Sequence, residues 1–197
     1  MILAFDTSSA ACTAALFGED GTCLDKRDEV IGRGHSERLV PMLDELLAGR
    51  RPDQILVGVG PGSFTGIRVA IAAAHGLAIG WGAELRGMSS LALIAAGNDG
   101  PLTVATLGGH GELFVQGFDG GDAGDLMNLT PDDAARFVTT DLVIGSGAAA
   151  LVAARGRGDA RDALPSARDA LRIAPKLRSL DPKPVYVRAP DAKAKAA

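Results

Sequence analysis

The sequence predicts an α/β protein made of two lobes with a similar layout. In each half, strand-like segments are followed by a helix, another strand, a glycine-containing turn and a second helix. The stretch Asn98-Asp99-Gly100-Pro101 separates the two halves and is the strongest turn signal in the chain. An ancient duplication of one mixed-sheet lobe flanked by helices fits this order. Chance similarity is the alternative, because the halves share no evident sequence identity.

These boundaries give an N-terminal lobe at residues 1–100 and a smaller C-terminal lobe at residues 101–188. A chain of 197 residues is long enough for either lobe arrangement or one large domain to bury a core. Residues 189–197 consist of Ala, Pro, Asp and Lys and have nothing to bury, so we expect a disordered tail.

Composition excludes some functions. A hydrophobic fraction of 47% and a net charge of −4 are typical of a soluble globular protein. A protein that binds nucleic acid by itself usually carries a basic excess, which this chain lacks. One Trp, one Tyr and six Phe are not interleaved with basic residues in the pattern of an RNA-stacking surface. The composition therefore argues against a chain that binds nucleic acid on its own.

The expected compartment is the cytoplasm. Cys12 and Cys23 are the only cysteines and have no metal-ligand spacing, which disfavours a disulfide scaffold. The N-terminal segment has no basic region typical of a signal peptide. The Ala-rich run at 69–79 is too short to span a membrane and contains His75. We expect no membrane contact.

Three strand-like segments open the first half, at 2–6, 11–17 and 22–30, and Glu19-Asp20-Gly21 is a hairpin turn signal. The meander that they predict is followed by a helix with Ser36 as its cap and Gly49 as its end. The remaining elements of this half are expected to be a strand at 55–59, a helix at 66–79, a strand at 83–87 and a helix from Ser89 or Ser90 to Ala96.

The second half contains the clearest helix start in the chain. Thr130-Pro131-Asp132-Asp133 combines an N-cap residue, Pro at the first helical position and carboxylates in the first turn. The other elements expected here are strands at 103–107, 112–118 and 141–145, helices at 148–154 and 166–175, loops at 120–128 and 156–163, and an extended segment at 184–188.

A glycine-rich loop joins strand 55–59 to the helix after it. Glycines at 60, 62 and 66 either present backbone N–H groups to an anion or let the helix pack closely on the sheet. The loop fails the P-loop pattern because Ile67-Arg68 follow Gly66, and Phe64 stands where a nucleophile elbow needs Ser. We therefore predict no catalytic residue here. The weak candidates for cofactor binding are Asp6, Gly60, Gly62, Gly66 and Arg68, and we expect no cofactor.

The histidines do not form a metal site. His35, His75 and His110 lie in different segments, and none belongs to a His-x-x-x-His pair. His110 beside Glu112 fits a general base or, more simply, two polar residues of a hairpin turn.

Asp6 ends the first strand and is followed by Thr7-Ser8-Ser9. This arrangement resembles the first phosphate loop of the actin-like ATPase superfamily, in which a carboxylate and hydroxyls approach Mg-phosphate. Gly145-Ser146-Gly147-Ala148 stands where that superfamily places its adenosine loop. The alternative is that Asp6 caps a turn. Two lobes with remnants of two loops favour a degenerate two-lobed actin-like (ASKHA) fold over a working ATPase.

Longer stretches resemble the bacterial TsaB (YeaZ) family. They are 1–9 (MILAFDTSS), 35–43 (HSERLVPML), 58–68 (GVGPGSFTGIR) and 184–188 (PVYVR). The resemblance implies a subunit of the machinery that makes N6-threonylcarbamoyladenosine at position 37 of tRNA. It implies a catalytic paralogue, TsaD, and a small ATPase, TsaE, as partners, and tRNA contact through the complex. Where the paralogue has its metal-binding His-x-x-x-His, this chain reads Arg86-Gly-Met-Ser-Ser-Leu91, which implies a non-catalytic partner.

The resemblance also implies that helices 36–48 and 66–79 form the surface that pairs with the paralogue, or with a second copy when the paralogue is absent. Helix 66–79 is apolar or small nearly all round, and such a helix is usually buried on several sides. Burial of this helix within its own lobe would explain only one of its apolar stripes. The residues that we expect at this interface are Leu39, Leu43, Leu46, Ile67, Ala70, Ile71, Ala74, His75 and Ala78.

The chain departs from the family that it resembles at Leu107-Gly108-Gly109, where many members have Asp-Ala-Arg. Any contact of the second lobe that this Asp and Arg support in other members lacks its side chains here. Two functions of other classes stay as alternatives. One is a small actin-like ATPase or sugar-type kinase that uses Asp6 and the glycine loops. The other is a glycopeptidase-like hydrolase, which is less favoured because no nucleophile–base pair is evident.

Overall fold

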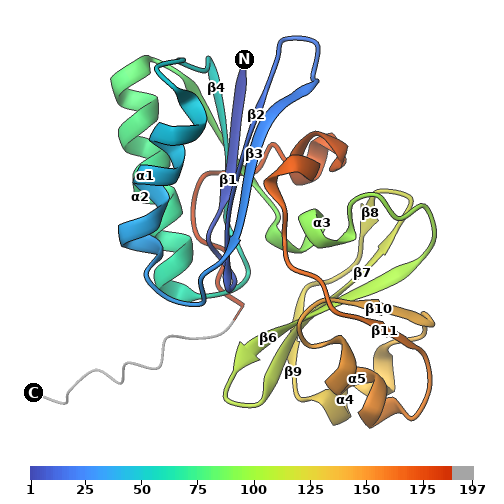
Figure 1. Cartoon of the computed structure of the whole chain (residues 1–197). Helices are drawn as coiled ribbons and strands as arrows, with labels where there is room; N and C mark the ends of the chain where they lie inside the picture. Colours follow the sequence, from blue (N-terminus) through green and yellow to red (C-terminus); the bar gives the residue numbers. More distant parts are fainter. Residues whose placement is uncertain (188–197) are drawn as a thin grey trace, which may run out of the picture.

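The computed structural model describes residues 1–187 and shows two lobes (Figure 1). The predicted tail at 189–197, together with Arg188, lies outside the described residues. In the first lobe, the strands β1 (Ile2–Asp6), β2 (Ala11–Phe17), β3 (Cys23–Val30), β4 (Gln54–Gly58) and β5 (Glu84–Met88) form one sheet in the order β3-β2-β1-β4-β5. The β1–β2 and β2–β3 pairs are antiparallel, and β4 runs parallel to β1 and β5.

Two helices, α1 (His35–Leu47) and α2 (Phe64–Trp81), cover one face of this sheet (Figure 1). Leu3 and Phe5 of β1 point toward these helices and are fully buried with them. Ala4, between them, points to the opposite face, as alternation along a strand requires. That opposite face packs toward α3 (Ser90–Ala95), whose six residues are all buried.

The second lobe repeats the plan of the first. Its strands are β6 (Leu102–Gly109), β7 (Glu112–Asp119), β8 (Asp122–Ala123), β9 (Met127–Leu129), β10 (Leu142–Ile144) and β11 (Asp159–Arg161). The sheet order is β11-β10-β6-β7-β8, and β9 also pairs with β7. Strand β10 runs parallel to β6 as β4 does to β1, and β7 is antiparallel to β6 as β2 is to β1. Helices α4 (Pro131–Phe137) and α5 (Ala148–Arg155) pack on this sheet. The predicted architecture of two mixed-sheet lobes with the same layout is therefore confirmed.

Most predicted elements are present, with corrections at their ends. Helix α1 begins at His35 after Gly34, which has a φ of 86°, and the Ser36 hydroxyl donates to Glu37 and caps nothing. Helix α4 starts as predicted, with the Thr130 hydroxyl accepting from the Asp133 N–H at 3.2 Å. The loops expected at 120–128 and 156–163 instead contain the short strands β8, β9 and β11.

Helix α2 has 18 residues and is longer than the Ala-rich run at 69–79, which we expected to be too short to span a membrane. Among residues 1–187 it is the one helix with the length and apolar composition to cross a membrane, with a mean hydropathy of 1.3 over 18 residues. Helix α2 packs against β4, β5, β1 and α1. Because the core helix of a folded lobe passes the same test, this single helix is weak evidence of a membrane.

The last part of the described chain packs on the first lobe. Residues 166–187, here called the return segment, contain two 3-10 turns, Ala167–Arg172 and Pro175–Leu177, where an α-helix was expected. The Ala167 N–H donates to the Thr13 hydroxyl at 2.7 Å, and the Val185 N–H donates to the Val59 carbonyl at 2.8 Å. Leu180 exchanges two backbone hydrogen bonds with Gly87. The return segment, although it follows the second lobe in sequence, thus packs on the first sheet.

Asp28 holds the start of the return segment. Its Oδ1 accepts from the Thr13 hydroxyl at 2.5 Å and from the Ser166 hydroxyl at 2.8 Å. Burial by itself would raise the pKa of Asp28, but the hydrogen bonds from Thr13, Ser166 and Lys26 outweigh it and lower the pKa below its ordinary 3.8. A carboxyl whose pKa is lowered in the folded state stabilises that state above its unfolded pKa and loses this effect as the pH falls through the folded value.

We expect Asp28→Ala to destabilise the chain at pH 7 by about 1–2 kcal/mol, because Thr13 and Ser166 lose a charged acceptor. The difference from wild type should be constant above pH 5 and shrink below about pH 4, where Asp28 becomes protonated in the unfolded and then in the folded state. Urea unfolding at a series of pH values measures both effects. A difference that stays unchanged down to about pH 2 would contradict the role of the Asp28 charge.

Candidate functional site

The Asp6 carboxylate lies where three loops of the first lobe meet, and it is fully buried. Its Oδ1 accepts from the N–H and the hydroxyl of Ser8, each at 2.7 Å. Its Oδ2 accepts from the hydroxyl of Ser90, the first residue of α3. The Ser90 hydroxyl in turn accepts from the Gly60 N–H at 3.0 Å. Both carboxylate oxygens therefore have protein donors, and Asp6 joins the end of β1 to the glycine loop and α3.

The glycine loop packs directly on the turn after β1. The Ser63 N–H donates to the Ser8 carbonyl at 2.6 Å, and the Gly66 N–H donates to the Ser63 hydroxyl at 3.2 Å. A Cβ at Gly62 would lie 2.1 Å from the Ser8 carbonyl oxygen, and one at Gly66 would lie 1.9 Å from that of Thr7. Glycine is needed because two backbones touch there. The N–H groups of residues 60, 63 and 66 all bond within the lobe, which favours the packing interpretation over the anion site.

The corresponding turn of the second lobe also has glycines where two backbone segments touch. The Gly147 N–H donates to the Ala105 carbonyl at 2.9 Å, and a Cβ at Gly145 would lie 2.4 Å from that oxygen. The Ser146 hydroxyl accepts from the Leu107 N–H at 3.2 Å. The loop that resembles an adenosine loop therefore packs on β6, as the first glycine loop packs on the β1 turn.

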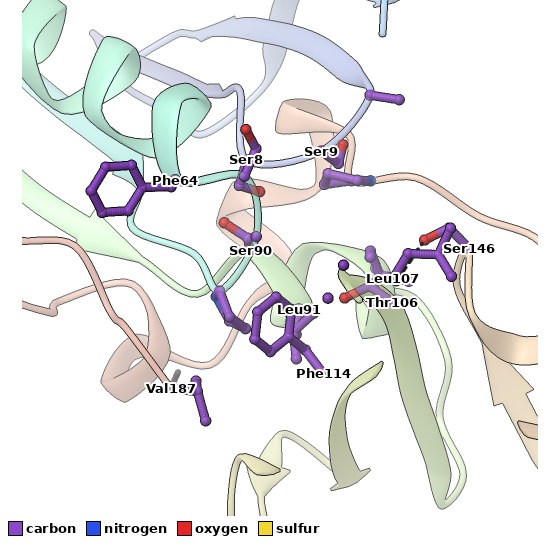
Figure 2. Close-up of a pocket in the computed structure, with 18 of the residues that line it drawn as sticks. Ser8, Ser9, Phe64, Ser90, Leu91, Thr106, Leu107, Phe114, Ser146 and Val187 are labelled. Carbon is purple, nitrogen blue, oxygen red and sulfur yellow. Dashed lines mark hydrogen bonds between the residues drawn. The ribbon is translucent and has the colours of Figure 1, made fainter. Parts of the chain in front are cut away.

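A cleft of about 690 Å³ lies between these two sets of loops. In Figure 2, Ser8, Ser9 and Ser90 face it from the first lobe, Thr106, Leu107 and Ser146 face it from the second, and Leu91 and Phe114 lie between them. The lining residues that the structure describes include no Asp, Glu, Lys or Arg. Charged side chains of the kind expected around a triphosphate therefore do not face the cleft from the described residues.

Arg68 does not serve the glycine loop. Its guanidinium carbon lies 3.7 Å from the centre of the Phe64 ring, and its Nε donates to the Tyr186 hydroxyl at 2.8 Å. The Phe64 and Tyr186 rings stack with their centres 5.3 Å apart. Arg68 thus fixes the start of α2 to the return segment through a cation–π contact and a hydrogen bond. Phe64 and Tyr186 were not among the predicted site residues, although Tyr186 is the only Tyr in the sequence.

The three histidines lie apart from one another. His35 is buried, with its Nε2 atom 3.2 Å from the Ala11 carbonyl oxygen. His75 is exposed on α2, and His110 lines the cleft in a left-handed conformation with a φ of 54°. Within residues 1–187, no group of three or more His, Cys, Asp and Glu side chains is close enough to hold a metal ion.

The residues expected at the pairing surface are mostly core residues of the first lobe. Leu39, Leu43, Leu46, Ile67, Ala70, Ile71 and Ala74 are all at most 8% exposed and pack between the helices and the sheet. Ala78 is partly buried against the same core, and only His75 is exposed. The helical periodicity identified the apolar stripe correctly, but that stripe faces the lobe's own sheet. The outward residues of the two helices include Val40, Ala72, Gly76 and Ile79.

The two sheets of like order and the cleft between the lobes define the class: this is a two-lobed protein with the actin-like fold. Residues 28–138 match the family model described as TsaD, tRNA N6-adenosine threonylcarbamoyltransferase. A crystal structure of a Pseudomonas aeruginosa protein described as similar to peptidase YeaZ has a TM-score of 0.78 and 30% identity, covering 95% of this chain and 99% of that one. YeaZ from the same organism gives a TM-score of 0.77 at 29% identity, covering 94% and 98%. The chain belongs to the TsaB (YeaZ) family.

Similarity to the curated relatives is concentrated in part of the chain. The tRNA threonylcarbamoyladenosine biosynthesis protein TsaB of Escherichia coli (strain K12) is 39% identical over 101 residues, which are 49% of this chain and 43% of that protein. The Bacillus subtilis (strain 168) protein of the same description is 35% identical over 100 residues, 48% of this chain and 43% of that protein. The matched region thus spans less than half the length of these relatives.

Proposed function

We propose that the chain acts in the biosynthesis of threonylcarbamoyladenosine in tRNA, as a non-catalytic subunit that pairs with a TsaD-like catalytic protein and activates it. The family and the names of the curated relatives support the pathway. The match of residues 28–138 to the TsaD model supports a paralogous partner, since two chains of one fold can pair through equivalent surfaces as two identical subunits do. A TsaE-like ATPase and tRNA would be reached through the complex.

The observation that carries the non-catalytic role is the state of Asp6. A carboxylate that serves Mg-phosphate must be reached by the ion or its water, and Asp6 is fully buried. Both oxygens of Asp6 accept hydrogen bonds from serines of its own lobe, and no charged residue is among the described residues that line the cleft. These contacts favour a scaffold over the alternative, a small actin-like ATPase or kinase. Calorimetry of the chain with Mg-ATP tests the choice, because micromolar binding would favour the alternative.

The outer face of α1 and α2 supports the pairing. Val40 is 62% exposed and Ile79 is 83% exposed, although both are large and apolar. Ala72 and Gly76 lie between exposed positions of α2, and their small side chains would let a partner helix approach closely. We call Val40, Ala72, His75, Gly76 and Ile79 the outer helix face. It would contact the TsaD-like partner, or a second copy of this chain when the partner is absent.

We expect Ile79→Glu to weaken association with a co-expressed TsaD-like protein at least tenfold, because it would bury a carboxylate in an apolar contact. Phe137→Glu is the matched control: Phe137 is 63% exposed on α4 of the other lobe, so association should not change. Analytical size exclusion and interferometry measure the effect. Equal association of Ile79→Glu and wild type would refute the outer helix face as the contact.

The pathway has its own test. In a strain that lacks the chain, mass spectrometry of tRNA nucleosides should show a loss of threonylcarbamoyladenosine, restored by wild type and by Phe137→Glu but reduced with Ile79→Glu. Normal levels of the modified nucleoside in the deletion strain would overturn the proposal.

A further inference from the structure

We propose that α3 and the return segment hold the two lobes together as one rigid unit, so that the cleft between the lobes keeps a fixed width. Domains of one chain usually move relative to each other, unless the interface between them is large and hydrophobic. Moving two domains apart across such an interface would expose buried apolar surface to water. The contact between these two lobes is of this hydrophobic kind.

A single buried apolar cluster contains residues of both sheets. Phe17 and Leu56 belong to it from the first sheet, and Leu102 and Phe114 belong to it from the second. The other face of each sheet has a cluster of its own, formed with α1 and α2 in the first lobe and with α4 and α5 in the second. The two facing sides of the lobes therefore have one core in common, which we call the shared cluster.

Helix α3 lies between the two lobes (Figure 1) and is part of the shared cluster, in which Leu91 and Ile94 are buried. The helix packs against β6 and β7 of the second lobe and against the 3-10 turn Ala167–Arg172 of the return segment. Ser90, at its start, donates to the Asp6 carboxylate of the first lobe. Because α3 contacts both lobes with buried side chains, neither lobe can rotate without breaking contacts of close-packed atoms.

The return segment also contacts both lobes. Its first 3-10 turn packs on β1, β2 and β3, and Ala170 and Ile173 are buried in the shared cluster. Farther along, Lys176 forms an ion pair with Asp122 of β8 in the second lobe. An exposed ion pair of this kind contributes little free energy. The buried residues of the return segment therefore carry most of its effect on the lobes.

The width of the cleft depends on this shared core. Leu91 and Phe114 belong to the shared cluster and are also among the residues that line the cleft. A hinge motion that opened or closed the cleft would have to repack the cluster, and packed cores change between discrete arrangements instead of deforming continuously. The lobes should therefore neither open nor close, and they should also unfold together.

Urea unfolding followed by Trp81 fluorescence tests whether the lobes unfold as one unit. Trp81, the last residue of α2 in the first lobe, is the only Trp in the sequence. Thr130→Ala removes the hydroxyl that caps α4 in the second lobe. We expect this change to lower the urea midpoint that Trp81 reports by about 0.3–1 M, because the loss of a helix cap destabilises the whole of one cooperative unit.

Thr139→Ala is the matched control. Thr139 is exposed just after α4, so the midpoint of this variant should equal that of wild type. Circular dichroism, which reports the helices of both lobes, should follow the same single transition as Trp81 fluorescence. The proposal is overturned if Thr130→Ala leaves the Trp81 midpoint unchanged, or if the two signals give separate transitions.

Distances between spin labels, measured by pulsed electron paramagnetic resonance, test the fixed width. One label is attached at Glu19→Cys in the first lobe and one at Ala150→Cys in the second, both exposed positions, in a chain that also carries Cys23→Ser. Burial raises the pKa of the Cys12 thiol to about 11, so Cys12 stays unlabelled at neutral pH. The pair Glu19→Cys and Asp44→Cys, within the first lobe, is the control.

We expect one distance distribution between the lobes, no broader than that of the control pair. A distribution that is clearly broader or has two peaks would show a hinge between the lobes and would overturn the proposal. None of these outcomes bears on the pairing role, which is decided separately by association of the Ile79→Glu chain and by the nucleoside content of tRNA.

Discussion

Gly66→Ala and Gly76→Ala, two identical changes in α2, are expected to shift stability in opposite directions. At Gly66 the new methyl group would lie 1.9 Å from the Thr7 carbonyl oxygen, a backbone atom that cannot move without displacing the turn after β1. The same shift would strain the hydrogen bond from the Thr7 hydroxyl to the Gly66 carbonyl, 2.6 Å long. We expect a loss of about 3 kcal/mol or more, as for severe overpacking of a core.

At Gly76 nothing lies within 4 Å of the added methyl group. Replacing glycine by alanine inside a helix should then stabilise the chain by about 0.5–1 kcal/mol, since the unfolded chain loses freedom. In a protein of this size each kcal/mol corresponds to about 2–4 °C in melting temperature. Calorimetric melting should therefore place Gly66→Ala well below wild type and Gly76→Ala slightly above it. Equal melting temperatures for the two variants would show that the glycine loop does not contact the β1 turn as described.

Asp6→Ala is expected to destabilise the chain by about 3 kcal/mol or more, because the N–H and hydroxyl of Ser8 and the hydroxyl of Ser90 lose a buried acceptor together. Asp6→Asn should be milder, since the amide oxygen still accepts from Ser8. Urea unfolding measures the order wild type, Asn, Ala. The structural role predicts this order whether or not any nucleotide is present.

The same variants separate the structural role from a catalytic one. If Asp6 held Mg-phosphate, Asp6→Asn would abolish binding of Mg-ATP while leaving the fold nearly as stable as wild type. A stable Asp6→Asn protein that has lost a measurable affinity for Mg-ATP is thus the result that would falsify the structural interpretation and restore the ATPase alternative.

Much of the fold was predictable because its signals are local. The bounds of β1 and β2 were predicted to the residue, since each strand is a run of buried residues bounded by polar turns. Strand β11 was missed because all three of its residues are exposed, so no apolar alternation marks it. The return segment was predicted as an α-helix, but Pro175 and contacts with β1, β2 and β3 favour short 3-10 turns.

The site was less predictable because it depends on distant residues. Periodicity identified the apolar stripe of α2 but not the surface that this stripe contacts. The stripe packs on the sheet of its own lobe, so Gly76 and Ile79 lie on the exposed side of the helix. Asp6 could be noticed at the end of its strand, but its donors come partly from Ser90, 84 positions later. The stacking of Phe64 with Tyr186 likewise joins two segments that no local pattern connects.

The return segment also sets an order of events while the chain is being made. Ala4, Ala15 and Phe17 of the first sheet are buried together with Ala167, Ala170 and Ile173. The hydrogen bond between Thr13 and Ala167 spans 154 positions. The earliest strands to leave the ribosome therefore keep part of one apolar face open until almost all of the described chain has been synthesised. During that time this apolar surface of the nascent first lobe is open to aggregation, as transiently exposed apolar surface generally is.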